Sequence, residues 1–200
     1  MCHPFFSILI PVFNTGKTLP RCLDSIFTQS CEDFEIILVD DASTDNSRQI
    51  AETYAKRDSR LKIIALSENS GRDNARLTAI KAASGNYIIF CDSDDELLPD
   101  FLEKAKKYSE SNCDIIVFGR TRVSGELVSA ELRHQMRAWT LKHRQILKGK
   151  EIFRAFFLEK KFSCALWGKC FKADLLQWYT PLEIGNCTAE DFLRITVLLF

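Results

Sequence analysis

The sequence has no excess charge of either sign. Its 200 residues include 27 basic and 27 acidic side chains, so the formal net charge at pH 7 is zero. Proteins that bind nucleic acid usually carry a basic bias, and this balance gives no support to such a partner. Long hydrophobic runs are also missing, because Pro11 and Asn14 interrupt the first apolar stretch, which is too short to span a bilayer. No basic segment precedes this stretch, so we predict no signal peptide.

Several common site motifs are missing as well. The eight cysteines form no Cys-x-x-Cys pair, which argues against zinc ribbons and thioredoxin-like sites. No Gly-x-Gly-x-x-Gly sequence occurs, and a P-loop ending at Gly16-Lys17-Thr18 would need a glycine where Pro11 stands. We therefore exclude dinucleotide-binding and P-loop sites. We interpret the cysteines as free thiols of a cytoplasmic protein.

Residues 6–118 instead show a regular alternation of strand and helix patterns. Short apolar segments predict strands, and apolar residues spaced three and four apart predict helices. This alternation is typical of an α/β fold with a doubly wound, mostly parallel sheet. The strands lack polar alternation, as expected where helices cover both faces of a sheet. The predicted strands are residues 6–12, 34–39, 61–66, 87–91 and 114–118, and the predicted helices are residues 18–29, 43–54, 73–83 and a segment after Pro99.

The pattern changes after Gly119. Residues 121–150 predict irregular structure or a loosely packed helix, residues 164–171 an extended segment, and residues 188–200 a helix. We therefore divide the chain into a core, residues 6–118, and a region, residues 119–200, that completes the same domain. The apolar run of residues 195–200 would be unusual on an exposed surface. We expect a partner, a membrane surface or further chain to cover it.

The most informative feature is the acidic sequence Asp-Ser-Asp-Asp at residues 92–95. It directly follows a predicted strand, which places it at the carboxyl edge of the sheet, where open α/β sheets bind ligands. Crowded carboxylates repel one another unless a cation or hydrogen-bond donors compensate. Asp92 and Asp94 could both reach Mg²⁺ or Mn²⁺, which prefer oxygen ligands and keep positions for phosphate oxygens. The alternative is a solvated acidic turn that caps the next helix.

Polar segments also follow the other strands. Because the carboxyl ends of parallel strands meet at one edge of a sheet, these segments would line a single crevice. The crevice would offer hydrogen-bonding groups for a base, carboxylates for a cation and shaped backbone for a ribose. These are the parts that a nucleoside diphosphate requires. The segments are residues 11–14, 40–45, 69–72 and 92–95.

These segments, in this order and at this spacing, resemble glycosyltransferase family 2. Residues 7–14 are similar to the opening strand of that family, residues 22–29 and 33–45 to its next block, and residues 85–100 to its metal-binding DXD block. Weaker similarity continues at residues 167–172 and at Glu190-Asp191. The resemblance implies a GT-A fold, in which residues 6–118 are the nucleotide-sugar-binding core and residues 119–200 are a smaller acceptor-side region.

The resemblance also implies roles for individual residues. Asp40 would accept a hydrogen bond from the nucleotide base, usually uracil, and Pro11 and Phe13 would line the base pocket. Asp92 would contact the ribose or the metal ion, and Asp94 would ligate Mg²⁺ or Mn²⁺. For Asp40 and its neighbour Asp41, the alternative is a role in capping a helix.

Three further residues receive roles from the same resemblance. Arg72 and Arg76 follow the third strand and are assigned to the donor substrate, although Leu77 departs from the family pattern there. Asp191 would be the general base that activates the acceptor hydroxyl. The alternative for Asp191 is an acid in the first turn of a helix, favoured by the helix dipole.

We therefore predict an inverting glycosyltransferase. It would move a sugar from a nucleotide-diphospho sugar, expected to be UDP-linked, to a saccharide or lipid-linked saccharide acceptor, in bacterial surface polysaccharide synthesis. The expected location is the cytoplasm, with attachment to the inner face of the plasma membrane or self-association through residues 195–200 as further expectations. Two alternatives remain, an inactive nucleotide-sugar-binding module and a nucleotidyltransferase. Residues 11–16 lack the glycine-rich basic loop that the latter would need.

Overall fold

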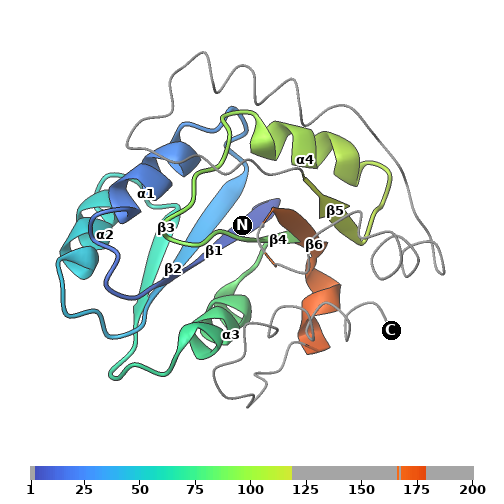
Figure 1. The fold of residues 1–200 in the computed structure, drawn as a ribbon. Coiled ribbons are helices and arrows are strands. Elements are labelled where there is room, and N and C mark those ends of the chain that lie inside the picture. Colours follow the sequence, from blue (N-terminus) through green and yellow to red (C-terminus); the bar gives the residue numbers. More distant parts are fainter. Residues whose placement is uncertain (1–2, 119–165, 167, 179–200) are drawn as a thin grey trace.

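The computed structural model describes residues 3–118, 166 and 168–178. Within this part of the chain, a six-stranded sheet has helices on both faces (Figure 1). The strand order is β3-β2-β1-β4-β6-β5, with β1 to β4 parallel to one another, which confirms the predicted α/β fold. Along the chain, the elements are β1 (Phe6–Val12), α1 (Leu19–Phe27), β2 (Phe34–Asp40), α2 (Ser47–Ala55), β3 (Leu61–Ala65), α3 (Arg72–Ala82), β4 (Tyr87–Phe90), α4 (Phe101–Ser109), β5 (Ile115–Val117), β6 (Lys169–Lys172) and the 3-10 helix η2 (Ala173–Trp178).

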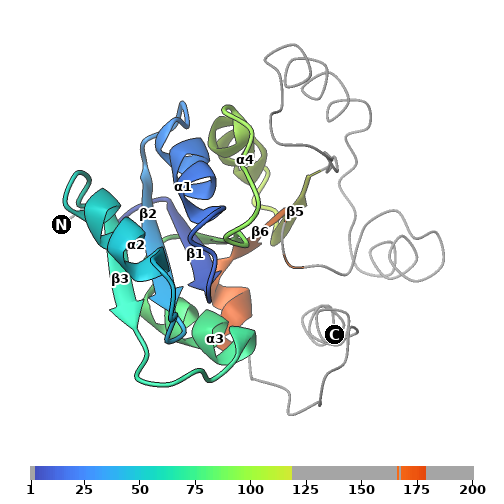
Figure 2. The same ribbon diagram turned by 60° about the vertical axis from the view of Figure 1, so that its left-hand side comes forward.

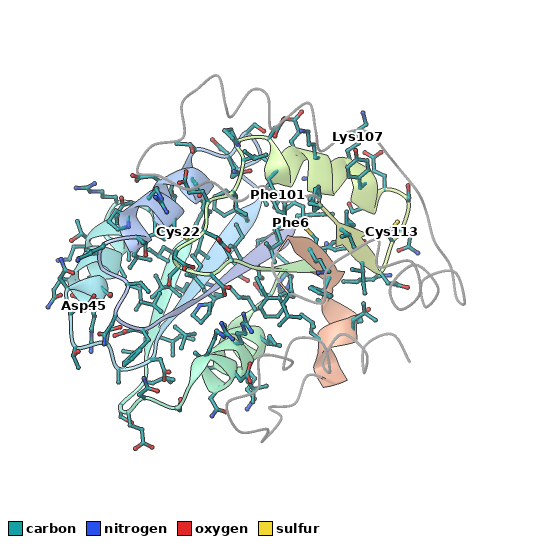
Figure 3. The ribbon with its side chains drawn as sticks, in the orientation of Figure 1. Phe6, Cys22, Asp45, Phe101, Lys107 and Cys113 are labelled. Atoms are coloured by element: carbon teal, nitrogen blue, oxygen red, sulfur yellow. The ribbon has the colours of Figure 1, made fainter. Side chains whose placement is uncertain are left out.

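The sheet separates two hydrophobic cores. Side chains alternate between the two faces of a strand, so Ile8 and Ile10 of β1 belong to one core and Leu9 to the other. The larger core lies beneath α1, α2 and α4, where the rings of Phe6 and Phe101 are buried (Figure 3). The second core lies beneath α3 and η2 on the opposite face (Figure 2). Burial on both faces explains why the strand sequences show no polar alternation.

The strand β6 comes from far along the chain and lies between β4 and β5, antiparallel to both. It overlaps the extended segment that we predict at residues 164–171, and it joins the same sheet as the core strands. The segments predicted at residues 121–150 and 188–200 lie outside the described residues, so their structure and the domain division remain predictions. None of the described helices is long and apolar enough to cross a membrane.

A polar network ties the strands together at the edge opposite the acidic residues. Glu35, which is buried at the start of β2, accepts hydrogen bonds from Ser7 Oγ at 2.7 Å, Lys62 Nζ at 2.7 Å, Ser84 N at 2.7 Å and Ser84 Oγ at 2.8 Å. Ser7 Oγ in turn accepts a hydrogen bond from Gly85 N at 2.8 Å. A Cβ atom at residue 85 would lie 2.6 Å from Ser7 N, so this close approach requires glycine.

This network predicts a pH dependence of stability. Burial alone would raise the pKa of Glu35, but the hydrogen bonds from Lys62, Ser7 and Ser84 hold the pKa below its ordinary value. The stabilisation is therefore complete above the unfolded pKa of about 4.3 and is lost as the pH falls through the lower folded pKa. We expect Glu35→Gln to lower the free energy of unfolding at pH 7 by about 1–3 kcal/mol and to reduce its dependence on pH in this acid range.

Urea denaturation of both proteins between about pH 3 and 7 measures this effect. The control is Glu52→Gln, which removes an exposed carboxylate paired with Arg48 and should change stability little. An equally steep loss of stability on acidification in wild type and Glu35→Gln would contradict the assignment.

Candidate functional site

The first strand ends at the predicted crevice. Pro11 lies beyond the last paired residues of β1 and β4, Leu9 and Phe90, so its missing N–H costs no hydrogen bond between these strands. Two residues later, Phe13 is 45% exposed, although large apolar side chains are mostly buried in the described part of the chain. An exposed aromatic ring at this edge offers a flat surface for a planar ligand. The structure places Phe13 at the expected edge, and its contact with a nucleotide base remains a prediction.

The loop after β1 is held to the loop after β2 by Asn14. This residue has a φ of 53°, a left-handed conformation that asparagine tolerates better than most residues. Its Oδ1 accepts hydrogen bonds from Thr44 N at 2.8 Å and Asp45 N at 3.3 Å, and its own N–H donates to Ser43 Oγ at 3.0 Å. Gly16 N also donates to Asp45 Oδ2 at 2.9 Å. Hydrogen bonds therefore join the two loops beside Phe13.

Asp40 is buried at the end of β2, with 2% of its surface exposed. Its Oδ1 accepts a hydrogen bond from Ser43 N at 3.1 Å, which closes the turn after the strand. The helix α2 begins later, at Ser47, with Asn46 at the N-cap position, so Asp40 does not cap that helix. Base recognition by Asp40 remains a prediction.

Asp41 has a structural role that the sequence analysis missed. It is 3% exposed and accepts hydrogen bonds from Ser70 N at 2.8 Å, Ser70 Oγ at 3.2 Å and Gly71 N at 2.9 Å. These bonds fix the loop between β3 and α3 against the end of β2. The doubled aspartate, Asp40-Asp41, was the available signal, but only the fold shows that the second carboxylate binds backbone N–H groups of a distant loop.

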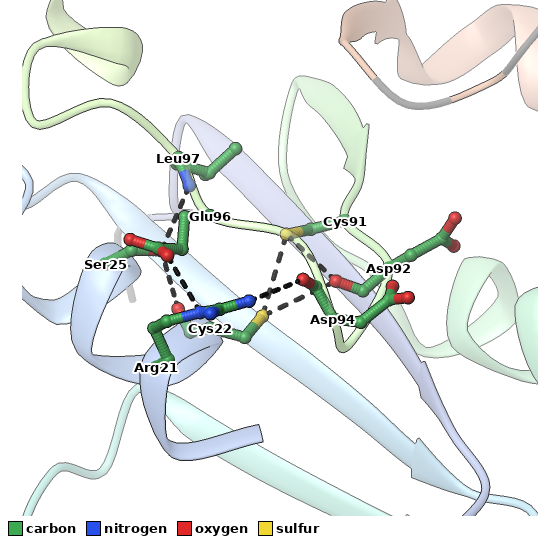
Figure 4. A network of polar contacts seen from close by, with 8 residues as sticks. All are labelled: Arg21, Cys22, Ser25, Cys91, Asp92, Asp94, Glu96 and Leu97. Carbon is green, nitrogen blue, oxygen red and sulfur yellow. Dashed lines mark hydrogen bonds and ion pairs between the residues drawn. The ribbon is translucent and has the colours of Figure 1, made fainter. Parts of the chain in front are cut away.

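The acidic cluster follows β4, as predicted. The carboxylates of Asp92 and Asp94 point to the same side of their loop, away from α1 (Figure 4). Partial desolvation, together with the charges of Asp92 and Asp94, raises the pKa of Asp95 to about 6, and Arg21 offsets part of this effect. The crowding that we expect from the sequence is therefore present in the fold.

The structure places the two predicted arginines of α3 differently. Arg76 is completely buried, and its Nη2 lies 3.1 Å from Asp92 Oδ1. The guanidinium group also lies over the ring of Phe90, 5.9 Å from its centroid. Arg76 thus holds Asp92 in place, and its direct contact with substrate remains a prediction. Arg72 is exposed one helical turn earlier, at the start of α3, where a cation can face solvent or a ligand.

The residues of the cluster suit a hard cation. Among residues 3–118, 166 and 168–178, no group of three or more His, Cys, Asp or Glu side chains is arranged to hold a metal ion. Mg²⁺ and similar ions commonly bind through one or two carboxylates, with water and phosphate oxygens in the remaining positions. Asp92 and Asp94 can supply two such oxygen ligands, so the donor set fits an ion that is completed by substrate.

The predicted catalytic residue cannot be placed in this site. Asp191 and its neighbour Glu190 lie outside the described residues, as does Trp167 of the weaker family block. The other residues of that block, from Gly168 to Lys172, form β6 and the turn before it, and so belong to the sheet. The role of Asp191 as general base remains a prediction.

Comparison with known protein families agrees with this geometry. The model described as glycosyl transferase family 2 matches residues 7–167, which is most of the chain. The chain belongs to glycosyltransferase family 2. This confirms the resemblance that the order of the sequence segments suggests. The matched residues include the loops that follow β1, β2 and β4.

Individual relatives extend the comparison. Glycosyltransferase GlyA of Streptococcus pneumoniae is 33% identical over 198 residues, which cover 96% of this chain and 28% of GlyA. Poly(ribitol-phosphate) beta-glucosyltransferase of Bacillus spizizenii is 41% identical over 119 residues, which cover 58% of this chain and 19% of that protein. The crystal structure of S. aureus TarS 1–349 in complex with UDP superposes with a TM-score of 0.75 at 27% identity, over 97% of this chain and 54% of TarS 1–349. This family 2 chain spans about a third of the length of the curated relatives EpsJ, EpsH and GlyA.

Backbone strain in the loop after β2 leads to a prediction. Ala42 has a φ of 58°, and the left-handed conformation costs a residue with a Cβ about 1–2 kcal/mol. Glycine removes this cost but loses more entropy on folding. We expect Ala42→Gly to raise the free energy of unfolding by up to about 1 kcal/mol.

The matched control is the same substitution in a regular helix. Ala51 is buried in α2, so Ala51→Gly should lower the free energy of unfolding by about 1 kcal/mol or more. Chemical denaturation of both variants measures the two effects. Equal destabilisation by both substitutions would show that residue 42 is not strained.

Proposed function

We propose that this chain forms the donor-binding core of a glycosyltransferase that uses a UDP-linked sugar. The observation that supports this most directly is the shared sheet edge. Phe13, Asp40 and the carboxylates of Asp92 and Asp94 lie at or just beyond the carboxyl ends of adjacent parallel strands. A similar structure, TarS, was solved with UDP, which supports a uridine nucleotide as the ligand.

The arrangement suggests how a donor would bind. The exposed ring of Phe13 would stack on the base, and Asp40 would accept a hydrogen bond from it at the end of β2. Asp92 and Asp94 would hold Mn²⁺ or Mg²⁺ against the diphosphate, and Arg72 would add a positive charge from the start of α3. When bound, the metal ion would offset the charge that develops on the leaving diphosphate.

The sugar would then pass to an acceptor hydroxyl. In our proposal, Asp191 removes the proton from this hydroxyl as its oxygen attacks the anomeric carbon, and the bond to the diphosphate breaks in the same displacement. A single displacement inverts the anomeric configuration. The similarity to a poly(ribitol-phosphate) beta-glucosyltransferase favours an acceptor in a bacterial surface polymer. Such an enzyme would work in the cytoplasm or at the inner face of the plasma membrane, where residues 195–200 could contact lipid or a second copy.

The metal site has a direct test. Asp94→Asn keeps the shape of the side chain and removes its charge, so we expect the affinity for UDP in the presence of Mn²⁺ to fall at least tenfold. Uridine binding without metal should change little, because that contact involves no phosphate. Calorimetry with and without EDTA measures both affinities.

The control is Asp114→Asn, which removes an exposed carboxylate just before β5, away from the cluster. Unchanged Mn²⁺-dependent affinity in a folded Asp94→Asn protein would exclude this residue as a metal ligand. Failure of the wild-type protein to bind UDP under any condition would refute the proposed donor.

The catalytic base has a separate test. Asp191→Asn should leave UDP binding nearly unchanged and slow sugar transfer roughly 10²–10⁴-fold, because a positioned general base typically contributes that much. Glu190→Gln is the matched control and should retain most of the activity. Transfer rates with a UDP-sugar and a polyol-phosphate acceptor measure the effect. Slow sugar transfer by Glu190→Gln, together with a normal transfer rate for Asp191→Asn, would assign the base to Glu190. A wild-type protein that binds UDP but transfers no sugar would favour an inactive module.

A further inference from the structure

One side of α1 contacts the segment that carries the acidic cluster, residues 92–99, which we call the acidic loop. Arg21 Nη2 donates a hydrogen bond to Asp94 O at 3.3 Å, and Arg21 Nε lies 2.8 Å from Glu96 Oε1 (Figure 4). Cys22 Sγ donates to Asp92 O at 3.6 Å. The two residues of α1 thus bind the backbone of the two aspartates that we assign to the metal ion.

The contacts continue along the loop. Ser25 Oγ accepts a hydrogen bond from Leu97 N at 3.0 Å. Gln29, just past the end of α1, donates from Nε2 to Leu98 O at 2.7 Å and accepts at Oε1 from Leu102 N at 3.1 Å. Arg21 and Ser25 are four residues apart, which places them on one stripe of the helix surface, and Gln29 follows at the same spacing just past the end of the helix. We call these three residues the α1 anchor.

The anchor residues contact a part of the chain that has little regular structure of its own. The acidic loop lies between β4 and α4, and its own backbone forms one turn in which Asp95 N donates to Asp92 O at 3.0 Å. Ser25 and Gln29 are only 7% and 6% exposed. Buried polar groups are costly unless they are hydrogen-bonded, so these side chains strongly favour the observed path of the loop.

Charge gives the anchor a second effect. The carboxylates of Asp92, Asp94 and Asp95 repel one another before any cation binds. The guanidinium group of Arg21 binds the loop from the side opposite the Asp92 and Asp94 carboxylates (Figure 4). It therefore offsets part of the negative charge without occupying the positions that a metal ion would need.

We propose that the α1 anchor is a positioning device that holds the acidic loop in its metal-binding path before the ligand arrives. Arg21, Ser25 and Gln29 are then positioning residues for the donor site, and this role rests on the proposed function. Two of the three anchor residues, Ser25 and Gln29, belong to the segment 22–29 that resembles the family. Preorganisation of this kind removes an ordering cost that binding would otherwise include.

The test uses two variants that remove different parts of the anchor. Arg21→Ala removes a half-exposed side chain, and Ser25→Ala removes the acceptor of Leu97 N without any change of charge. In both, amide hydrogen exchange of residues 94–97 in the ligand-free protein should speed up at least tenfold. The affinity for UDP with Mn²⁺ should fall at least tenfold, and the affinity for metal-free uridine should stay within about twofold of wild type.

Two controls sharpen the interpretation. Arg48→Ala removes an exposed arginine that pairs with Glu52 on α2, and it should change neither hydrogen exchange of the acidic loop nor UDP affinity. Arg21→Lys keeps the charge but cannot reproduce the forked contact with Glu96 and Asp94 O, so we expect it to recover only part of the affinity.

Several results would overturn the proposal. Faster exchange with unchanged Mn²⁺-dependent affinity would show that the anchor orders the loop without serving the site. Weaker affinity with unchanged exchange would assign Arg21 a purely electrostatic effect, and an equal loss of uridine binding would indicate general destabilisation. Wild-type protein that binds no UDP would refute the proposed function and the anchor's role in it, whereas unchanged hydrogen exchange in both variants would refute the anchor alone.

Discussion

Mutual repulsion among the carboxylates that follow β4 is the constraint on which the site depends. Repulsion would drive these carboxylates away from one another in water. Contacts from two sides of the loop hold them in place. From α3, the buried Arg76 binds the side chain of Asp92. From α1, Arg21 binds the backbone at Asp94 and the carboxylate of Glu96. The helices α1 and α3 lie on opposite faces of the sheet, so the acidic loop is held from both faces.

The rest of the crevice is built by the same kind of interaction. Side-chain oxygens bind backbone N–H groups of neighbouring loops, as Asn14 does at Thr44 and Asp41 does at Gly71. Such bonds join segments about thirty residues apart, a separation that backbone turns cannot bridge by themselves. The loops can therefore follow irregular paths around a ligand and still keep fixed positions relative to one another.

The sequence predicted more of the fold than of the contacts within the site. Apolar runs located β1, β2 and β4 closely, because these strands are buried on both faces and their patterns have few alternatives. The position of β6 next to β4 was not predictable, since its register depends on packing between segments far apart in the chain. Cys22 and Leu23 marked the apolar side of α1, but periodicity says nothing about what a polar residue such as Ser25 contacts. The burial of Arg76 was missed for the same reason, because an arginine in a helix pattern is ordinarily expected at the surface.

The place of β6 has a consequence for how the chain is made. During synthesis, β1 to β4 leave the ribosome well before Lys169, so β6, which covers the edge of β4 in the finished sheet, is the last of the described strands to be made. Among the described strands, β5 pairs with β6 and not with β4, so β5 does not close that edge of β4. An unpaired edge of a parallel sheet is a template for contact with other chains. This edge of β4 therefore lacks the strand that covers it in the finished sheet until residues 169–172 have been made.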